Sequence, residues 1–241
     1  MTFKRIHKAL IISVVMLTAV VTYLLSSRKA QPNPVTGEMQ HIIMTPDQEV
    51  SLGIEWAPEL AIRFGGIYQN GDADKKVKTI GKKLVSSSAI ARSPYQFDFH
   101  VLADSHTVDA FALPGGQIFL TSGLYKKLKT NDEIAAILSH QIGHVIGRHA
   151  SEKLFKTSIF VGIVNPDTIV ISELPPRLIS KYLSDFIKLH YDGQEENEAN
   201  HLGIGYATQA GFNQGSFSKK FFIEEDTDKE LKLFLEKHSG L

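Results

Sequence analysis

Two histidines near the centre of the chain have the spacing of metal ligands. His140 and His144 lie four residues apart, which on an α-helix puts them about 40° apart in projection, so both imidazoles can reach one ion. A catalytic zinc site needs a third protein ligand. A later segment with helical character supplies three candidate carboxylates, Glu195, Glu196 and Glu198. We favour Glu196, because Asn200 lies four residues further along the same helix face and can support the site.

Other interpretations of these histidines remain open at this point. The chain contains 10 histidines, so a pair of partly buried helix histidines without a metal is an alternative. A second zinc arrangement would need a histidine ten residues after His140, but Ala150 occupies that position. His149 is one residue too early, and on a continuous helix it points away from the pair. We therefore expect His149 to be a surface or core histidine.

The ligands require two helices to position them. Thr130 and Glu133 form a capping box ahead of an apolar run, which predicts a helix from about Asn131 to Lys153. The candidate carboxylates lie on a second predicted helix, from about Gln194 to Ala210, which Gly211 ends. The fold must therefore bring two helices that are distant in sequence into contact.

The rest of the pattern predicts an α+β domain. A capping box with a proline predicts a helix from Pro46 to about Arg63, and an amphipathic run predicts another from about Asp72 to Val85. Alternation over Phe97–Ala103 is typical of a half-buried strand. Two short strands, Ala110–Leu113 and Gln117–Thr121, flank a Pro-Gly-Gly turn. We expect a mainly helical domain with a small antiparallel sheet.

Composition limits the possible functions. With 241 residues and 43% hydrophobic content, the chain suits one sizeable domain. Its 26 basic and 26 acidic residues cancel, so no overall field attracts nucleic acid, and we expect no nucleic-acid partner. Cysteine is absent, which excludes disulfides and thiolate ligands and leaves histidine and carboxylate to bind a metal.

The N-terminus has the pattern of a membrane anchor. Residues 1–8 are basic, and residues 9–27 carry no formal charge and are long enough for one helix across a bilayer core of about 30 Å. A cleaved signal peptide is the alternative, but no convincing small-residue cleavage site precedes Arg28. The charge bias predicts a single span with the domain on the outer side, which is the periplasm for a bacterial inner membrane. Residues 28–44 are interpreted as an extended linker, and residues 45–241 as the domain.

Four motifs in this order resemble a known family. They are Asn33–Gly37 with Thr45–Glu49, the run from Asp109 to Leu124, the run His140-Gln141-Ile142-Gly143-His144, and the segment from Glu196 to Gly203. Over these segments the chain is similar to the zinc metalloendopeptidases of the HtpX, BepA and CAAX-prenyl-protease kind, which are gluzincins. The resemblance implies a zincin-like metallopeptidase domain with one Zn²⁺ per chain, held by His140, His144 and Glu196. It also implies a peptide substrate along an edge strand at Gln117–Thr121, contacted by Asp109, Gly116, Gln117 and Phe119.

Three residues depart from the family pattern at chemically important positions. The resemblance places a glutamate general base where this chain has Gln141, and an amide cannot accept the proton of a metal-bound water. The family's aspartate that orients a ligand histidine is Asn200, and its asparagine before Ala-Phe-Ala is Asp109. Gly143, which the family shares, is interpreted as allowing close packing against the sheet. A weaker similarity near the end of the chain makes His238 a candidate site residue.

These observations support three hypotheses of function. The first is a membrane-anchored zinc metalloendopeptidase-like protein that is catalytically impaired, a pseudopeptidase, and that holds unfolded or extended polypeptide by strand addition. The second is an active zinc metalloendopeptidase of membrane or envelope protein quality control, in which Glu195, Glu198 or water replaces the missing base. The third is a membrane-tethered structural scaffold.

Overall fold

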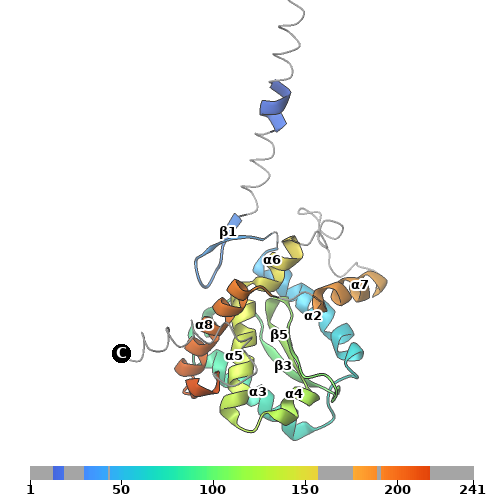
Figure 1. The fold of residues 1–241 in the computed structure, drawn as a ribbon, viewed down its shortest axis with the longest axis vertical. Helices are drawn as coiled ribbons and strands as arrows, with labels where there is room; N and C mark the ends of the chain where they lie inside the picture. The colour runs from blue at the N-terminus through green and yellow to red at the C-terminus, as the bar shows by residue number, and fades with distance from the viewer. Residues whose placement is uncertain (1–12, 19–29, 43, 157–175, 189–190, 218–241) are drawn as a thin grey trace, which may run out of the picture.

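The computed structural model describes residues 13–18, 30–42, 44–156, 176–188 and 191–217. The longer helices are α2 (Pro46–Arg63), α3 (Gly71–Ser86), α5 (Asn131–Gly147), α7 (Pro176–Ile187) and α8 (Gly193–Gln209). Two shorter helices are α4 (Ser122–Lys127) and α6 (His149–Lys156). The strands are β1 (Ala30–Pro32), β2 (Met39–His41), β3 (Asp98–Leu102), β4 (Ala110–Ala112) and β5 (Gln117–Thr121). Short 3-10 turns are η1 (Ala89–Arg92), η2 (Pro114–Gly116) and η4 (Gln214–Ser216). The mainly helical α+β fold is confirmed (Figure 1).

The helix starts follow from local hydrogen bonds, as the sequence predicts. The Thr45 hydroxyl accepts the Gln48 amide N–H at 3.3 Å, and the Gln48 side chain accepts the Thr45 N–H at 2.9 Å. The same reciprocal pair between Thr130 and Glu133 opens α5. Each pair satisfies two backbone donors that a helix leaves without partners at its first turn.

The small sheet is mixed, which corrects the expectation of an antiparallel sheet. Its strand order is β3-β5-β4. The β4–β5 hairpin turns through Gly115 and Gly116, whose φ angles of 77° and 118° favour glycine. Strand β5 lies between β4, with which it pairs antiparallel, and β3, with which it pairs parallel. The prediction of an edge strand at Gln117–Thr121 is therefore wrong, because β5 is paired on both sides, and β3 and β4 are the edge strands.

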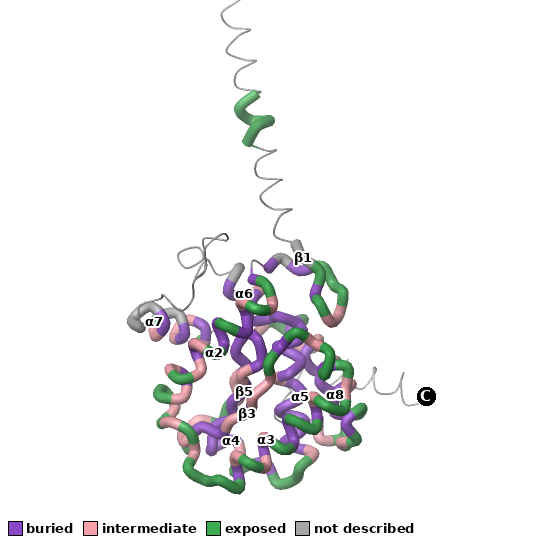
Figure 2. The backbone as a smooth tube through the Cα atoms, turned by 180° about the vertical axis from the view of Figure 1, so that it is seen from behind, coloured by how far each residue is buried: buried purple, intermediate pink, exposed green. Residues whose placement is uncertain are grey.

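Helices cover both faces of this sheet. On one face, Phe99, Val101, Ile118 and Leu120 belong to a buried cluster with residues of α3 and α5. On the other, Phe119 and Leu102 belong to a second cluster with residues of α2 and α7. In β3 the predicted alternation is observed, because Phe99 and Val101 are buried whereas Asp98 and His100 are partly exposed. Strand β5 in the middle of the sheet is buried on both faces (Figure 2).

The two helices that carry the candidate ligands pack at backbone contact. A Cβ at Gly143 of α5 would lie 2.4 Å from the carbonyl oxygen of Ala199 in α8. From the other side, a Cβ at Gly203 would lie 2.9 Å from the backbone nitrogen of His140. Gly143 thus permits close packing, as expected, but against α8 and not against the sheet. The two helices lie side by side in Figures 1 and 2.

Helix α5 ends earlier than the sequence pattern predicts. A continuous helix to Lys153 was expected, whereas α5 stops at Gly147 and α6 begins at His149. Arg148 between them has a left-handed backbone, with φ 60°. Its buried guanidinium lies 3.1 Å from the Glu49 carboxylate and donates to the Met44 carbonyl at 2.7 Å. These long-range contacts stabilise a conformation that costs about 1–3 kcal/mol for a residue other than glycine.

The segment expected to be an extended linker contains a hairpin. Strands β1 and β2 pair antiparallel, with Ala30 opposite His41. The Asn33 amide donates to the Ile146 carbonyl at 2.7 Å, and the Gln40 amide donates to the Gly147 carbonyl at 2.5 Å. The hairpin therefore caps the end of α5, whose last carbonyls have no partner within the helix.

Most of the predicted anchor, residues 9–27, lies outside the described residues. Of the helices that are described, none combines the length and the hydropathy of a membrane span. His238 also lies outside the described residues.

Candidate metal centre

Three side chains from α5 and α8 converge on one point. The Nε2 atoms of His140 and His144 are 3.0 Å apart. A carboxylate oxygen of Glu196 lies 3.4 Å from His140 Nε2, and the other lies 3.6 Å from His144 Nε2. Among the described residues, these three are the group whose ligand atoms all lie within 4.8 Å of one another. The structure therefore brings together the three residues predicted as ligands.

The geometry fits a tetrahedral metal ion. Two ligand atoms about 2.0–2.1 Å from such an ion are roughly 3.3 Å apart, which is close to the 3.0 Å between the two Nε2 atoms. The Glu196 carboxylate faces the same point, with one oxygen near each nitrogen. Both imidazoles are also oriented for this role, because their other nitrogens have partners. His140 Nδ1 lies 2.9 Å from Asn200 Oδ1, and His144 Nδ1 lies 2.9 Å from His149 Nδ1. The Nε2 atoms are thus the ones directed at the common point.

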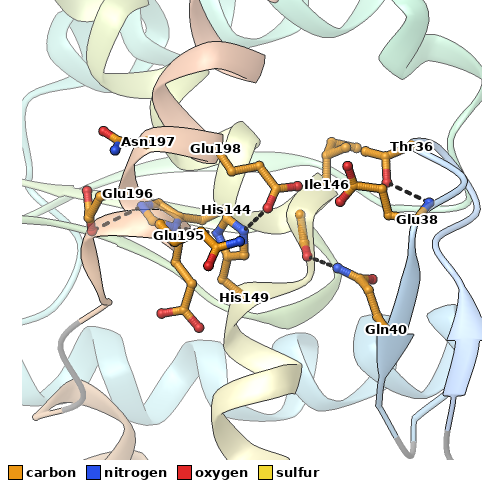
Figure 3. Close-up of polar contacts among 12 residues, drawn as sticks. Thr36, Glu38, Gln40, His144, Ile146, His149, Glu195, Glu196, Asn197 and Glu198 are labelled. Atoms are coloured by element: carbon orange, nitrogen blue, oxygen red, sulfur yellow. Dashed lines mark hydrogen bonds and ion pairs between the residues drawn. The ribbon is translucent and has the colours of Figure 1, made fainter. Parts of the chain in front are cut away.

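The two other candidate carboxylates have different partners. Glu195 caps α8 by accepting the Asp192 backbone N–H at 2.9 Å, and it lies 3.2 Å from the ammonium of Lys153. Glu198 lies 3.1 Å from His149 Nε2. Figure 3 shows Glu196 and Glu198 reaching toward the histidines from α8. Glu196 alone of the three approaches both ligand nitrogens.

His149 was expected to point away from the ligand pair, and this prediction is wrong. The expectation assumed an unbroken helix, and the left-handed Arg148 turns the chain so that the His149 ring meets His144. The expectation left a surface and a core position open, and His149 is in the core, with 1% of the residue exposed.

Burial controls the charge of His144. Loss of solvent is the main cause that lowers the pKa of His144 well below its usual range, and the nearby His140, His149 and Lys153 act in the same direction. A neutral imidazole is the form that binds a metal. The site therefore keeps His144 ready to act as a ligand at neutral pH.

Tyr191 is a site residue that sequence reasoning missed. Its ring stacks on His144 with centroids 4.1 Å apart and an angle of 20° between the planes. Burial raises the pKa of Tyr191, so the phenol keeps its proton. The only signal in the sequence is an aromatic residue next to Asp192, the N-cap of α8.

Gln141 occupies the accessible position of the metal helix. From Glu133 to Gly147, every residue of α5 is buried except Gln141. Its side chain is an amide, which can donate and accept hydrogen bonds but cannot take up a proton near neutral pH. The helix therefore presents no proton acceptor at the residue next to His140.

The residues predicted to contact substrate lie in different environments. Asp109 is exposed at the start of β4, and its carboxylate accepts the Ala110 N–H at 2.8 Å. Gln117 is partly exposed, and its amide donates to the Gln96 carbonyl at 3.4 Å. Gly116 is buried against Gln96, and Phe119 is 1% exposed on the far face of the sheet. Both of these residues are buried, so neither offers accessible surface to a substrate.

Comparisons with known proteins agree with this arrangement. Two buried histidines four residues apart on one helix, with a glutamate from a second helix, have the composition of a metallopeptidase site. The profile of Peptidase family M48 matches residues 72–236, and the chain belongs to this family. Members of the family are zinc-dependent in general.

The similar proteins include two kinds of protease. The chain is 30% identical to the mitochondrial metalloendopeptidase OMA1 of Schizosaccharomyces pombe over 137 residues. This match covers 57% of this chain and 40% of the relative. It is 24% identical over 191 residues to the beta-barrel assembly-enhancing protease of Yersinia pestis, covering 75% of this chain and 38% of the relative. OMA1 of Saccharomyces cerevisiae is 30% identical over 121 residues, covering 48% of this chain and 34% of the relative. The chain thus spans well under half the length of these relatives.

Proposed function

We propose that this chain is a membrane-anchored zinc metalloendopeptidase-like protein whose peptidase activity is impaired and which holds extended or unfolded polypeptide. The observation that carries the proposal is Gln141, a neutral amide at the accessible position of the helix that bears two ligands of a complete triad. When bound, zinc supplies Lewis-acid polarisation of a peptide carbonyl and of water. Hydrolysis also needs a group that moves a proton. In the metalloendopeptidases that the chain resembles, that group is a glutamate, and Gln141 stands in its place.

The described carboxylates beside the triad support the loss of activity. Glu198 is engaged by His149 and Glu195 by Lys153, with distances of 3.1 and 3.2 Å. A substitute base would first have to leave these partners. The absence of a positioned base commonly costs on the order of 10² to 10⁴ in rate.

The proposed peptide site is the side of β4 that faces away from β5, where no strand of the described residues pairs. Leu113 donates to the Gln117 carbonyl, and Thr121 donates to the Asp109 carbonyl. In this antiparallel register, the backbone groups of Ala110 and Ala112 point away from β5. An extended peptide adding there would form main-chain hydrogen bonds beside α5, and it would displace the Asp109 carboxylate from the Ala110 N–H.

The first experiment combines metal analysis with a protease assay. Purified protein is expected to contain one zinc per chain and to leave unfolded casein almost uncut, whereas Gln141→Glu is expected to cleave casein in a chelator-sensitive way. His140→Ala in the Gln141→Glu background is the control and should remove both zinc and cleavage. Vigorous chelator-sensitive cleavage by the unmodified chain would refute impairment and support the active alternative, an envelope quality-control protease. Folded protein without zinc affinity would refute the metal site.

Peptide binding has its own test. Ala110→Pro removes one outward N–H of β4 without touching a β4–β5 hydrogen bond, and Ala110→Val keeps that N–H. We expect fluorescently labelled unfolded casein to bind to the valine variant and to lose affinity for the proline variant. Equal binding by both variants would contradict strand addition at β4. Partner binding that survives loss of all three ligands would favour the scaffold alternative.

The location is part of the proposal. The apolar run at residues 9–27 supports a single N-terminal span with the domain on the outer, periplasmic side of a bacterial inner membrane. Protease accessibility of the domain in spheroplasts, compared with sealed inverted vesicles, would test this orientation. Protection of the domain in spheroplasts would refute it.

A further inference from the structure

A second histidine and a second carboxylate form a chain of contacts that ends on a metal ligand. His144 Nδ1 lies 2.9 Å from His149 Nδ1, and His149 Nε2 lies 3.1 Å from Glu198 Oε2. Neither His149 nor Glu198 belongs to the triad of His140, His144 and Glu196. Figure 3 shows Glu198 of α8 extending over the His149 ring.

The backbone around His149 is built for this contact. A Cβ at Gly147 would lie 2.4 Å from His149 Nε2 and 2.7 Å from Cε1, so only glycine leaves room for the ring. The left-handed Arg148 then turns the chain between α5 and α6, and the buried Glu49 carboxylate lies 3.1 Å from the guanidinium of Arg148. Two consecutive residues with special requirements thus place His149 against His144.

The hydrogen positions in this chain follow from chemistry. His144 Nε2 faces His140 Nε2 and Glu196, so it must carry a lone pair to act as a ligand. Its proton is then on Nδ1, which donates to His149 Nδ1. His149 consequently carries its own proton on Nε2, which donates to Glu198 Oε2. Each histidine thus donates one hydrogen bond to the next group, and the Glu198 carboxylate accepts the last one.

The two ligand histidines therefore differ in their support. His140 is held by the neutral amide of Asn200 at 2.9 Å. His144 is held by an imidazole whose far side faces a carboxylate. A carboxylate behind a ligand histidine fixes the ring and raises the basicity of its metal-binding nitrogen.

We propose that His149 and Glu198 are positioning residues that orient His144 and strengthen its bond to the metal, so that the charged support absent at Asn200 is supplied at the other histidine. This inference rests on the zinc site of the proposed function. It predicts that metal affinity depends on two residues that do not touch the ion.

The test is the affinity of the full-length protein for Zn²⁺ and Co²⁺, measured by competition with a chromophoric chelator. Glu198→Gln keeps the shape of the side chain and removes its charge, and His149→Phe keeps a ring and removes both nitrogens. Each is expected to weaken metal binding by roughly 10- to 100-fold. His201→Gln, on the exposed face of α8, is the matched control and should bind like the wild type.

A double variant separates positioning from general damage. If Glu198 acts through His149, adding Glu198→Gln to His149→Phe weakens metal binding no further, whereas independent effects would multiply. The Co²⁺ absorption spectrum should change in both single variants, because the orientation of His144 changes. If His149→Phe does not fold, the partly exposed Glu198→Gln decides the question alone.

The outcomes distinguish this inference from the proposed function. Wild-type protein that binds no metal would refute the zinc site itself. Wild-type protein that binds zinc, together with unchanged affinity in Glu198→Gln or multiplying effects in the double variant, would overturn only the positioning role.

Discussion

A single methyl group at Gly143 should separate the two helices that carry the metal ligands. The Cβ of Gly143→Ala would lie 2.4 Å from the Ala199 carbonyl oxygen and 2.9 Å from its Cα. Both are backbone atoms, so no side-chain rotation relieves the overlap. To restore ordinary contact, α8 must move away from α5 by about 1 Å at this point.

Two opposing effects set the expected stability. Alanine in a helix interior is favoured over glycine by about 0.5–1 kcal/mol. Overpacking a close contact costs about 1–3 kcal/mol, so we expect a net loss of roughly 1–2 kcal/mol in the free energy of unfolding. Glu196 and Asn200 lie within one helical turn of Ala199 on α8, and metal–ligand distances are tolerated only within about 0.2 Å. Zinc affinity should therefore fall by at least about tenfold.

Gly205→Ala on α8 provides the matched control. Its Cβ would have no atom within 4 Å, so the same substitution should raise stability by about 0.5–1 kcal/mol and leave zinc affinity unchanged. Urea denaturation of the metal-free proteins and a zinc competition titration measure both quantities. The reasoning is refuted if Gly143→Ala stabilises the protein as Gly205→Ala does, with zinc affinity intact.

Three other perturbations test different parts of the structure. Arg148→Met should lower the free energy of unfolding, measured with denaturant, by about 3–5 kcal/mol, because the Glu49 carboxylate stays buried without the guanidinium. Adding Glu49→Gln should recover part of that stability, and no recovery would contradict the pairing. Removing zinc with a chelator should lower the melting temperature, since an ion present at 100 times its Kd stabilises the folded state by about 2.7 kcal/mol; an unchanged melting temperature would argue against a tight site. Burial lowers the pKa of His100 below 6.5, so the unfolded chain binds more protons, and stability falls as the pH drops from about 6.5 through the folded pKa. His100→Gln should remove this dependence, and parallel melting curves for both proteins between pH 5 and 8 would contradict it.

The parts of the fold that were predictable from sequence are local. Capping boxes lie within four residues, so the starts of α2 and α5 followed from Thr45 and Thr130. The β4–β5 hairpin followed from its Pro-Gly-Gly turn. The His140–His144 pair also followed from its spacing on one helix face, and Glu196 was favoured among three carboxylates because of Asn200 and the family resemblance.

The parts that were missed depend on contacts distant in sequence. The end of α5 is set by Arg148 and Glu49, which are 99 residues apart, so helical periodicity continues past the actual break. Strand alternation identified β5 but not its neighbours, because pairing with β3 depends on how the whole chain closes. The contacts of His149 and Tyr191 with His144 depend on the same tertiary features.

The hairpin formed by β1 and β2 matters for how the domain should be produced. A shortened protein starting at Thr45, where the first helix of the domain is capped, would retain every ligand. It would nevertheless lose the Asn33 and Gln40 amides that hold the Ile146 and Gly147 carbonyls. The end of α5 would then fray into solvent immediately before Arg148, and the turn that carries His149 would loosen. Expression boundaries chosen for crystallisation or metal titration should therefore begin before Ala30, even when the apolar N-terminal run is removed.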